Sequence, residues 1–162
     1  MSDFRVGIGV DAHVLQGGVP LVLGGVRIEY PRGLAGHSDG DVITHALIDA
    51  LLGAAGLGDI GTLFPSGDER WSGANSIDLL RETYRQVFAA GWTLVNADCV
   101  LIGEAPKIAP YREEMRRVLS QAVDGEVNVR ATTTDRLGFT GRAEGLAAQA
   151  VALLTRAAEP LA

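Results

Sequence analysis

The sequence predicts an α/β (α+β) fold, a two-layer sandwich in which helices cover one face of a mixed β-sheet. Strand-type and helix-type patterns follow one another in mixed order along the chain, with no internal repeat or linker between them. The 162 residues are 47% hydrophobic, which is enough apolar surface for a core without a disulfide. We therefore expect a single domain over residues 1–162.

The strand patterns are runs of alternating or β-branched apolar residues bounded by glycine turns. They cover residues 4–15, 20–30, 92–104 and 126–134. Gly17 and Gly18 mark a turn after the first run, so we expect residues 20–30 to form its hairpin partner. Residues 31–36 are then expected to form a loop.

The helix patterns have apolar residues recurring every three to four positions. They cover residues 41–56, 76–90 and 110–122, and the Ala-rich segment 141–158. Ser38 is the expected N-cap of the first helix, and Pro110 is expected at the first position of the third. Residues 57–75 are the longest irregular stretch, and long loops of this kind are often functional.

Composition argues against several classes of protein. The 20 acidic and 14 basic residues give a net charge of -6, and aromatic residues make up 6%, so we expect neither a nucleic-acid partner nor a membrane surface. The apolar runs around 46–58 and 146–154 are too short to cross a bilayer, and residues 1–5 do not resemble a signal peptide. Cys99 is the single cysteine, so no intrachain disulfide can form. We expect a cytoplasmic protein.

Two histidines and an aspartate form a candidate metal site. Asp11 and His13 are two residues apart, so in a strand their side chains point to the same face. His45 on the following helix can supply a third ligand, and an Asp/His/His set with an open fourth position is typical of catalytic zinc. The alternative is that both histidines are ordinary hydrogen-bonded core residues.

The segment Gly36–Asp41 (GHSDGD) places polar groups directly before a helix, where His37 and Ser38 could contact a phosphate. The alternative, which the local pattern favours, is a plain capping loop. Asp41 and Asp49 flank His45 at spacings of four, so all three share one helix face. A carboxylate there would fix the histidine tautomer, or the three residues form a solvated stripe.

A third polar segment follows the strand pattern at 126–134. Thr132, Thr133, Thr134 and Asp135 offer three hydroxyls and a carboxylate, a set that can hold magnesium on substrate phosphates. The alternative is a β-branched strand that ends in a turn. The glycine-rich segment 137–142 closes with Arg142 and is a weak signal by itself.

Taken together, these segments resemble the 2-C-methyl-D-erythritol 2,4-cyclodiphosphate synthase family of the non-mevalonate isoprenoid pathway. The resemblance covers about residues 5–157 and is carried by GIGVDAH (7–13), GHSDGDVITHALIDALLGAAGLGDIGTLFP (36–65), APK (105–107) and TTTDRLGFTGR (132–142). It implies cyclisation of 4-diphosphocytidyl-2-C-methyl-D-erythritol 2-phosphate with release of CMP. It also implies a homotrimer whose sheets face the threefold axis and whose sites lie at subunit boundaries.

The resemblance further implies roles for individual residues. Asp11, His13 and His45 would bind zinc, Asp135 would bind magnesium or manganese, and His37, Thr133 and Asp135 would be catalytic. The implied substrate contacts are Asp11, Ala12, His13, His37, Ser38, Asp59, Ile60, Gly61, Phe64, Pro65, Ser66, Gly67, Asp68, Gly103, Glu104, Ala105, Pro106, Lys107, Ile108, Ala109, Thr132, Thr133, Thr134, Asp135, Phe139 and Arg142.

The chain departs from the family pattern at four positions. Asp135 stands where Glu is common, Val10 where an aromatic residue often precedes the zinc Asp, and Gln149 where Glu is frequent on the last predicted helix. The position before Gly7 lacks the His of some members. Two other functions fit the site residues: a zinc phosphohydrolase that uses metal-bound water, and a non-enzymatic trimeric module that binds metal or nucleotide.

Overall fold

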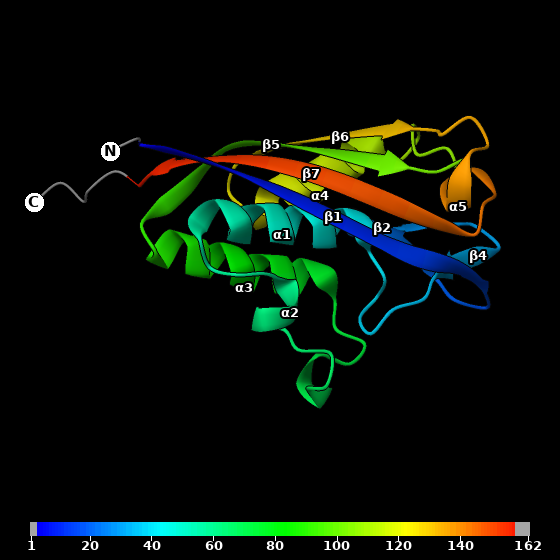
Figure 1. The fold of residues 1–162 in the computed structure, drawn as a ribbon, viewed down its shortest axis with the longest axis horizontal. Coiled ribbons are helices and arrows are strands. Elements are labelled where there is room, and N and C mark those ends of the chain that lie inside the picture. The colour runs from blue at the N-terminus through cyan, green and yellow to red at the C-terminus, as the bar shows by residue number, and fades with distance from the viewer. Residues whose placement is uncertain (1–2, 158–162) are drawn as a thin grey trace, which may run out of the picture.

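Five strands form one mixed sheet in the order β4-β1-β7-β5-β6, as the computed structural model of the chain shows (Figure 1). The structure describes residues 3–157. The strands are β1 (Phe4–Gly17), β4 (Arg32–Leu34), β5 (Trp92–Ile102), β6 (Glu126–Thr132) and β7 (Gly145–Arg156). All neighbours are antiparallel except β5 and β6, which run parallel and are joined across a helix.

Helices cover one face of this sheet, which confirms the predicted sandwich. The layer contains α1 (Val42–Ala55), α3 (Ser76–Ala89) and α4 (Arg112–Ala122). In Figure 1, α1 lies directly beneath β1 and β7, and α3 runs alongside α1 on the side away from the sheet. The core fills the space between the two layers, where Leu47, Leu51 and Leu80 have no exposed surface.

The approach of α1 to β1 depends on two glycines. A Cβ atom at Gly9 would lie 1.9 Å from the carbonyl oxygen of Ala46, and one at Gly7 would lie 2.0 Å from that of Ala50. No side chain fits at such distances, so backbone packs against backbone here. The strand that carries Asp11 and His13 is thereby held against the helix that carries His45.

The predicted last helix is wrong, because residues 145–156 form β7, the central strand of the sheet. Alanine and leucine favour helix as single residues, but this segment alternates between a face buried under α1 and a partly exposed face. Small residues such as Ala148 and Ala150 fit beneath the closely packed helix. Gln149 therefore lies on a strand, opposite Val10 of β1 and Val100 of β5.

The predicted hairpin is also wrong. Residues 20–30 contain β2 (Leu21–Leu23) and β3 (Val26–Ile28), which pair with each other in a separate two-stranded sheet. The partner of β1 on this side is β4, which lies inside the predicted loop 31–36. The Gly24–Gly25 turn, in which both residues have positive φ, makes a tight hairpin within the segment itself.

The starts of two helices need correction, and the irregular stretch contains short helices that were not predicted. Asp41, not Ser38, is the N-cap of α1, since its side chain accepts a hydrogen bond from the Thr44 amide. Helix α4 begins at Arg112, so Pro110 lies before the helix. The irregular stretch 57–75 contains two short pieces, α2 (Ile60–Leu63) and a 3-10 turn at Glu69–Trp71. The remaining strand and helix predictions are confirmed to within about two residues.

The sheet face opposite the helices is apolar and exposed. Val6, Ile8, Val10 and Val14 of β1 and Val151 of β7 are between 45% and 69% exposed. Apolar patches of this kind on a sheet commonly mark protein contacts. No helix within residues 3–157 is long and apolar enough to cross a membrane.

Candidate metal centre and substrate cavities

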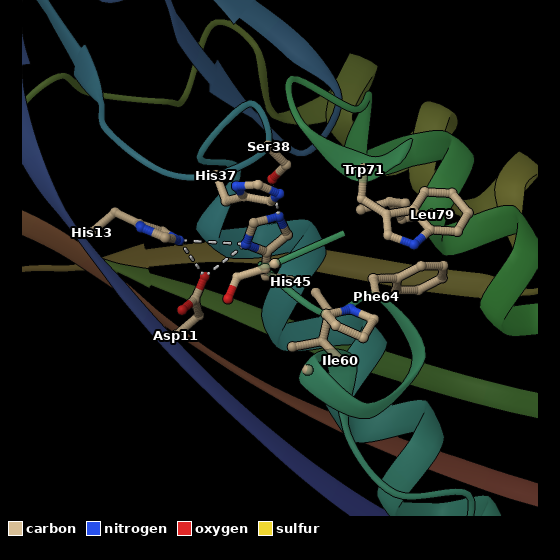
Figure 2. Close-up of a pocket in the computed structure, with 13 residues that line it drawn as sticks. Asp11, His13, His37, Ser38, His45, Ile60, Phe64, Trp71 and Leu79 are labelled. Carbon is tan, nitrogen blue, oxygen red and sulfur yellow. Dashed lines mark hydrogen bonds and ion pairs between the residues drawn. The ribbon is translucent and has the colours of Figure 1, made fainter. Parts of the chain in front are cut away.

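The three predicted zinc ligands come together at one point (Figure 2). Asp11 Oδ2 lies 2.9 Å from His13 Nε2 and 2.9 Å from His45 Nδ1, and the two histidine nitrogens are 3.4 Å apart. The two β1 residues point toward α1, as their spacing predicted, and His45 is on the first turn of that helix. The structure therefore supports the shared site over two separate core histidines.

These distances are close to those of a tetrahedral metal site. Zinc bonds of about 2.0–2.2 Å place neighbouring ligand atoms roughly 3.3–3.6 Å apart. The 3.4 Å between the histidine nitrogens matches this range, and the two 2.9 Å distances to Asp11 would have to lengthen slightly. Burial raises the pKa of the Asp11 carboxyl, but the two imidazoles beside it outweigh burial and bring its pKa down to about 2. The hydrogen bond to Asp11 raises the pKa of His13. The donor set is thus one carboxylate and two imidazoles with a fourth side open to a cavity.

That cavity has a volume of about 370 Å³. It brings together the metal ligands and most of the residues expected around the erythritol and phosphates: Asp11, His13, His37, Ser38, His45, Ile60, Gly61, Phe64, Pro65, Ser66 and Gly67. Trp71 and Leu79, which sequence reasoning missed, complete an apolar wall with Phe64 (Figure 2). The Phe64 and Trp71 rings meet edge to face, with centroids 4.9 Å apart.

Three predicted contacts of this region lie outside the cavity lining. Asp59 caps α2, where its carboxylate accepts hydrogen bonds from the amide and hydroxyl of Thr62, and these lower its pKa. Asp68 forms an ion pair with Arg70. Ala12 points to the other sheet face, where it shares a separate small pocket with Phe139.

Neither acid that shares the helix face of His45 forms a side-chain hydrogen bond with its imidazole. Asp41 is fully buried and accepts hydrogen bonds from the amides of Gly24, Gly25 and Thr44. Asp49 accepts the Ile60 amide at 2.7 Å, and burial raises its pKa. Both carboxylates therefore fix backbone segments around α1, a role outside the two predicted alternatives.

The hydrogen bonds of His45 Nε2 go instead to two serines. Ser38 Oγ lies 2.9 Å away, and Ser76 Oγ, at the start of α3, lies 2.8 Å away. Ser38 was predicted to contact a phosphate, while Ser76 was missed. Ser76 could not have been found from local pattern, because 31 residues separate it from His45.

A second cavity of about 230 Å³ lies at the other edge of the sheet. Its lining contains the predicted nucleotide-site residues Gly103, Pro106, Lys107, Ile108, Ala109, Thr132 and Thr133. Arg112, on the first turn of α4, adds a cation that sequence reasoning missed. Glu104 borders this region and accepts the Arg136 amide at 3.2 Å, and Ala105 precedes Pro106 in the same turn.

The remaining predicted residues extend beyond this cavity. Thr134 Oγ1 donates to the Leu137 carbonyl at 2.6 Å. Asp135 is exposed, has a φ of 51°, and accepts the Thr133 hydroxyl at 3.3 Å. Arg142, just after α5 (Gly138–Gly141), pairs with Glu144 at 3.2 Å. Asp135 therefore keeps most of its carboxylate available to a ligand.

The two cavities share no lining residue. The register places Ala12 of β1 in one row with Ala147 of β7, Ile102 of β5 and Thr132 of β6. Three strand spacings, about 14 Å, separate the ends of that row. The chain thus carries two separate cavities.

The sequence model of the YgbB family matches residues 4–155. The chain belongs to this family, that of the 2-C-methyl-D-erythritol 2,4-cyclodiphosphate synthases. The synthase of Salmonella typhimurium is 54% identical over 158 residues, covering 96% of this chain and 99% of the relative. The synthase of Geobacillus kaustophilus is 54% identical over 156 residues, covering 94% and 99%.

Solved structures of cyclodiphosphate synthases share the fold. One structure of the synthase in its CDP-bound form is 42% identical, with a TM-score of 0.85 over 93% of this chain and 99% of the other. The bifunctional IspDF from Campylobacter jejuni gives a TM-score of 0.91 at 42% identity over 94% of this chain. The match spans 42% of that longer protein.

Proposed function

We propose that the chain converts 4-diphosphocytidyl-2-C-methyl-D-erythritol 2-phosphate to 2-C-methyl-D-erythritol 2,4-cyclodiphosphate and CMP. The observation that carries the proposal is the convergence of three metal-ligand atoms at the mouth of a cavity, in a chain of the cyclodiphosphate synthase family. The CDP-bound relative supports a cytidine diphosphate as the substrate class.

The reaction is an intramolecular phosphoryl transfer. An oxygen of the 2-phosphate forms a bond to the β-phosphorus, and the bond from that phosphorus to the bridging oxygen of the α-phosphate breaks. CMP leaves with the bridging oxygen and its electron pair. Because the attacking oxygen is already anionic, the step needs no protein base, and catalysis rests on positioning and charge neutralisation.

Asp11, His13 and His45 would hold zinc, and Asp135 would hold magnesium or manganese. When bound, these ions supply Lewis-acid stabilisation of the charge on the phosphates. His37 and Ser38 would position the reacting phosphates at the rim of the first cavity, and Asp59, Ile60 and Gly61 would hold the erythritol hydroxyls. An exposed carboxylate such as Asp135, with oxygen ligands only, suits a hard cation on a diphosphate.

The nucleotide end of the substrate would occupy the second cavity. The segment from Gly103 to Ala109 would surround the cytidine, and Thr132, Thr133 and Thr134 would contact the diphosphate. Phe139 and Arg142 complete the proposed binding residues. Lys107 and Arg112 place two cations at this cavity, so it can attract a polyanion although the whole chain carries a charge of -6.

A complete site needs two chains. We place the metal half on one subunit and the cytidine half on its neighbour, in a homotrimer whose sheets face the threefold axis. The separation of the two cavities supports this arrangement, as does the exposed apolar face of β1 and β7. A ring with threefold symmetry joins two different surfaces of each chain, as such a shared site requires. A lone, buried cysteine fits a reducing compartment, and we propose the cytoplasm.

The test is product analysis with purified protein, zinc, magnesium and the substrate in water enriched in ¹⁸O. We expect stoichiometric CMP and a cyclic diphosphate that contains no solvent oxygen. A product that incorporates one solvent oxygen would show a zinc phosphohydrolase instead. No CMP release under any metal condition would leave only a binding function.

A further inference from the structure

A row of hydrogen bonds leads from the metal ligand His45 away from the cavity. His45 Nε2 meets Ser76 Oγ at 2.8 Å, and the Ser76 hydroxyl in turn donates a very short hydrogen bond to Asp39 Oδ1. The Ser76 amide donates to the other oxygen of Asp39 at 2.9 Å. Ser76 has no exposed surface, so water does not take part in these contacts.

The chemistry of the three groups fixes the direction of every hydrogen bond in the row. The Asp39 carboxylate is only an acceptor, and its donors are the Ser76 hydroxyl, the Ser76 amide and the Asp41 amide. The single hydroxyl hydrogen of Ser76 is therefore used at Asp39. The Ser76 oxygen must accept from His45, so Nε2 carries the hydrogen. In the neutral imidazole that a metal requires, Nδ1 then keeps its lone pair.

We propose that Asp39 and Ser76 are positioning residues that hold His45 in the tautomer and orientation required of a metal ligand. This inference rests on the metal site of the proposed function. The Nδ1 lone pair is directed at the point where Asp11 and His13 converge. A histidine ligand whose second nitrogen hydrogen is fixed by an acceptor is both better oriented and more basic.

Helix capping accounts for only one contact of Asp39, the hydrogen bond that its Oδ2 accepts from the first amide of α3, that of Ser76. Helix α3 already has Asn75 as its N-cap, whose side chain accepts the Ile77 amide at 2.9 Å. Asp39 instead spans 37 residues of sequence to receive the Ser76 hydroxyl. The sequence places Asp39 directly between Ser38 and the α1 cap region, so one loop supplies both a cavity residue and the acceptor at the end of the row.

The same hydrogen bonds also fix the direction of the Ser38 hydrogen bond. The one hydrogen on His45 Nε2 is shared between Ser76 Oγ and Ser38 Oγ, so Ser38 likewise accepts. Within residues 3–157 the Ser38 hydroxyl makes no other side-chain hydrogen bond that would use its hydrogen. Ser38 lines the cavity, and its hydroxyl hydrogen remains available to a phosphate oxygen.

The test measures zinc affinity directly, by competition with a chromophoric chelator, with zinc(II) as the only ligand added. Ser76→Ala removes the acceptor of the Nε2 hydrogen, and we expect zinc affinity to fall about 10- to 100-fold. Asp39→Asn replaces one of the two carboxylate oxygens that face Ser76 with an NH₂ group. If that group donates to Ser76, the serine turns its own hydrogen toward Nε2, so we expect a loss at least as large.

Thr83→Val is the matched control. Thr83 lies on the same helix as Ser76 and is also fully buried, and its hydroxyl has no hydrogen-bond partner within the described residues. We expect its zinc affinity to stay within about twofold of wild type, since it does not contact a ligand. Ser76→Thr keeps the hydroxyl and is expected to bind zinc more tightly than Ser76→Ala.

A second readout does not depend on affinity. In ¹⁵N-labelled, zinc-loaded protein, the His45 Nε2 hydrogen should give a slowly exchanging downfield resonance that disappears in Ser76→Ala. Wild-type zinc affinity and an unchanged resonance in both Ser76→Ala and Asp39→Asn would overturn the inference while the metal site stands. A wild-type chain that binds no zinc would overturn the metal site itself, and the inference with it.

Discussion

The molecule has one cavity at β1 and α1 and another at β5, β6 and α4. The two cavities differ in how firmly the chain holds their functional side chains in place. In the first, three ligand atoms lie within 4.8 Å of one another, and serines and an aspartate fix the orientation of His45. In the second, the residue expected to bind a cation, Asp135, is exposed and meets one hydroxyl at 3.3 Å. The three ligand atoms at the first cavity are therefore preorganised, whereas the Asp135 carboxylate near the second cavity is held by a single long hydrogen bond.

If the two cavities bind metal and nucleotide as proposed, this difference gives them separate tasks. Preorganised ligands lower the free-energy cost of binding a metal and of stabilising charge during the reaction. An open cavity with cations at its rim can admit and release a nucleotide. The comparison predicts large effects from changes in the first half and graded effects from changes in the second.

The largest expected effect is the loss of a metal ligand. His45→Ala, or His13→Ala, should lower turnover by at least about 10³-fold, because several kcal/mol of charge stabilisation disappear at about 1.4 kcal/mol per tenfold change. Metal analysis should give about one zinc per wild-type subunit and far less in the variant. Unfolding curves serve as the control for the fold. Near-normal turnover by metal-free His45→Ala protein would show that this half is not a metal site.

The next effect is recovery of activity in mixed trimers. Asp11→Ala disables the metal half, and Ala109→Trp fills the second cavity from an exposed position, so each variant alone should be inactive. After subunit exchange in equal amounts, about a quarter of the boundary sites would combine two intact halves. Recovery to about that fraction is expected. A mixture that stays inactive after demonstrated exchange would place both halves in one chain.

A smaller effect is expected at Asp135. Asp135→Asn removes the charge but keeps the size, and we expect turnover to fall about 10- to 100-fold with unchanged zinc content and partial recovery at high magnesium or manganese. Asp135→Glu restores the residue common in the family and should remain active. Asp124→Asn is the matched control, because Asp124 is also exposed with a left-handed φ of 43°. Equal activities in the two Asn variants would remove the metal role.

The smallest effect concerns the buried core at β5. Burial raises the pKa of the Cys99 thiol to about 12, and Cys99 on β5 has no exposed surface. The thiol should therefore stay protonated and unreactive toward a disulfide reagent at pH 8, and react fully once the protein is unfolded. Rapid labelling of the native protein would show that the core around β5 opens.

Local sequence patterns predict much of this fold but not its centre. The helix at 42–55 was predictable because its apolar residues recur with helical spacing and Gly56 ends it. The strand β7 was not, because Ala148, Ala150 and Ala152 are helix formers whose conformation is decided by β1, β5 and α1 around them. The alternation of buried and exposed positions along β7 is typical of a strand. It is hard to recognise in the sequence because so many of these residues are alanine.

The candidate site shows the same limit. Asp11, His13 and His45 follow from residue type and spacing together with the family pattern. Ser76 and Trp71 reach the site through tertiary packing, and neither has a distinctive local sequence. The roles of Asp41 and Asp49 depend on the amides of Gly25 and Ile60, which no side-chain pattern reveals.

The contact between Gly9 and the Ala46 carbonyl sets a tolerance on the metal site. The backbones of β1 and α1, which carry the ligands, touch directly at this point with no flexible side chain between them. The distance between the two backbones therefore does not change when core side chains repack. Changes elsewhere in the core can alter stability without moving the ligands. A single methyl group at position 9 would instead force β1 and α1 apart and so change the distances between the metal ligands.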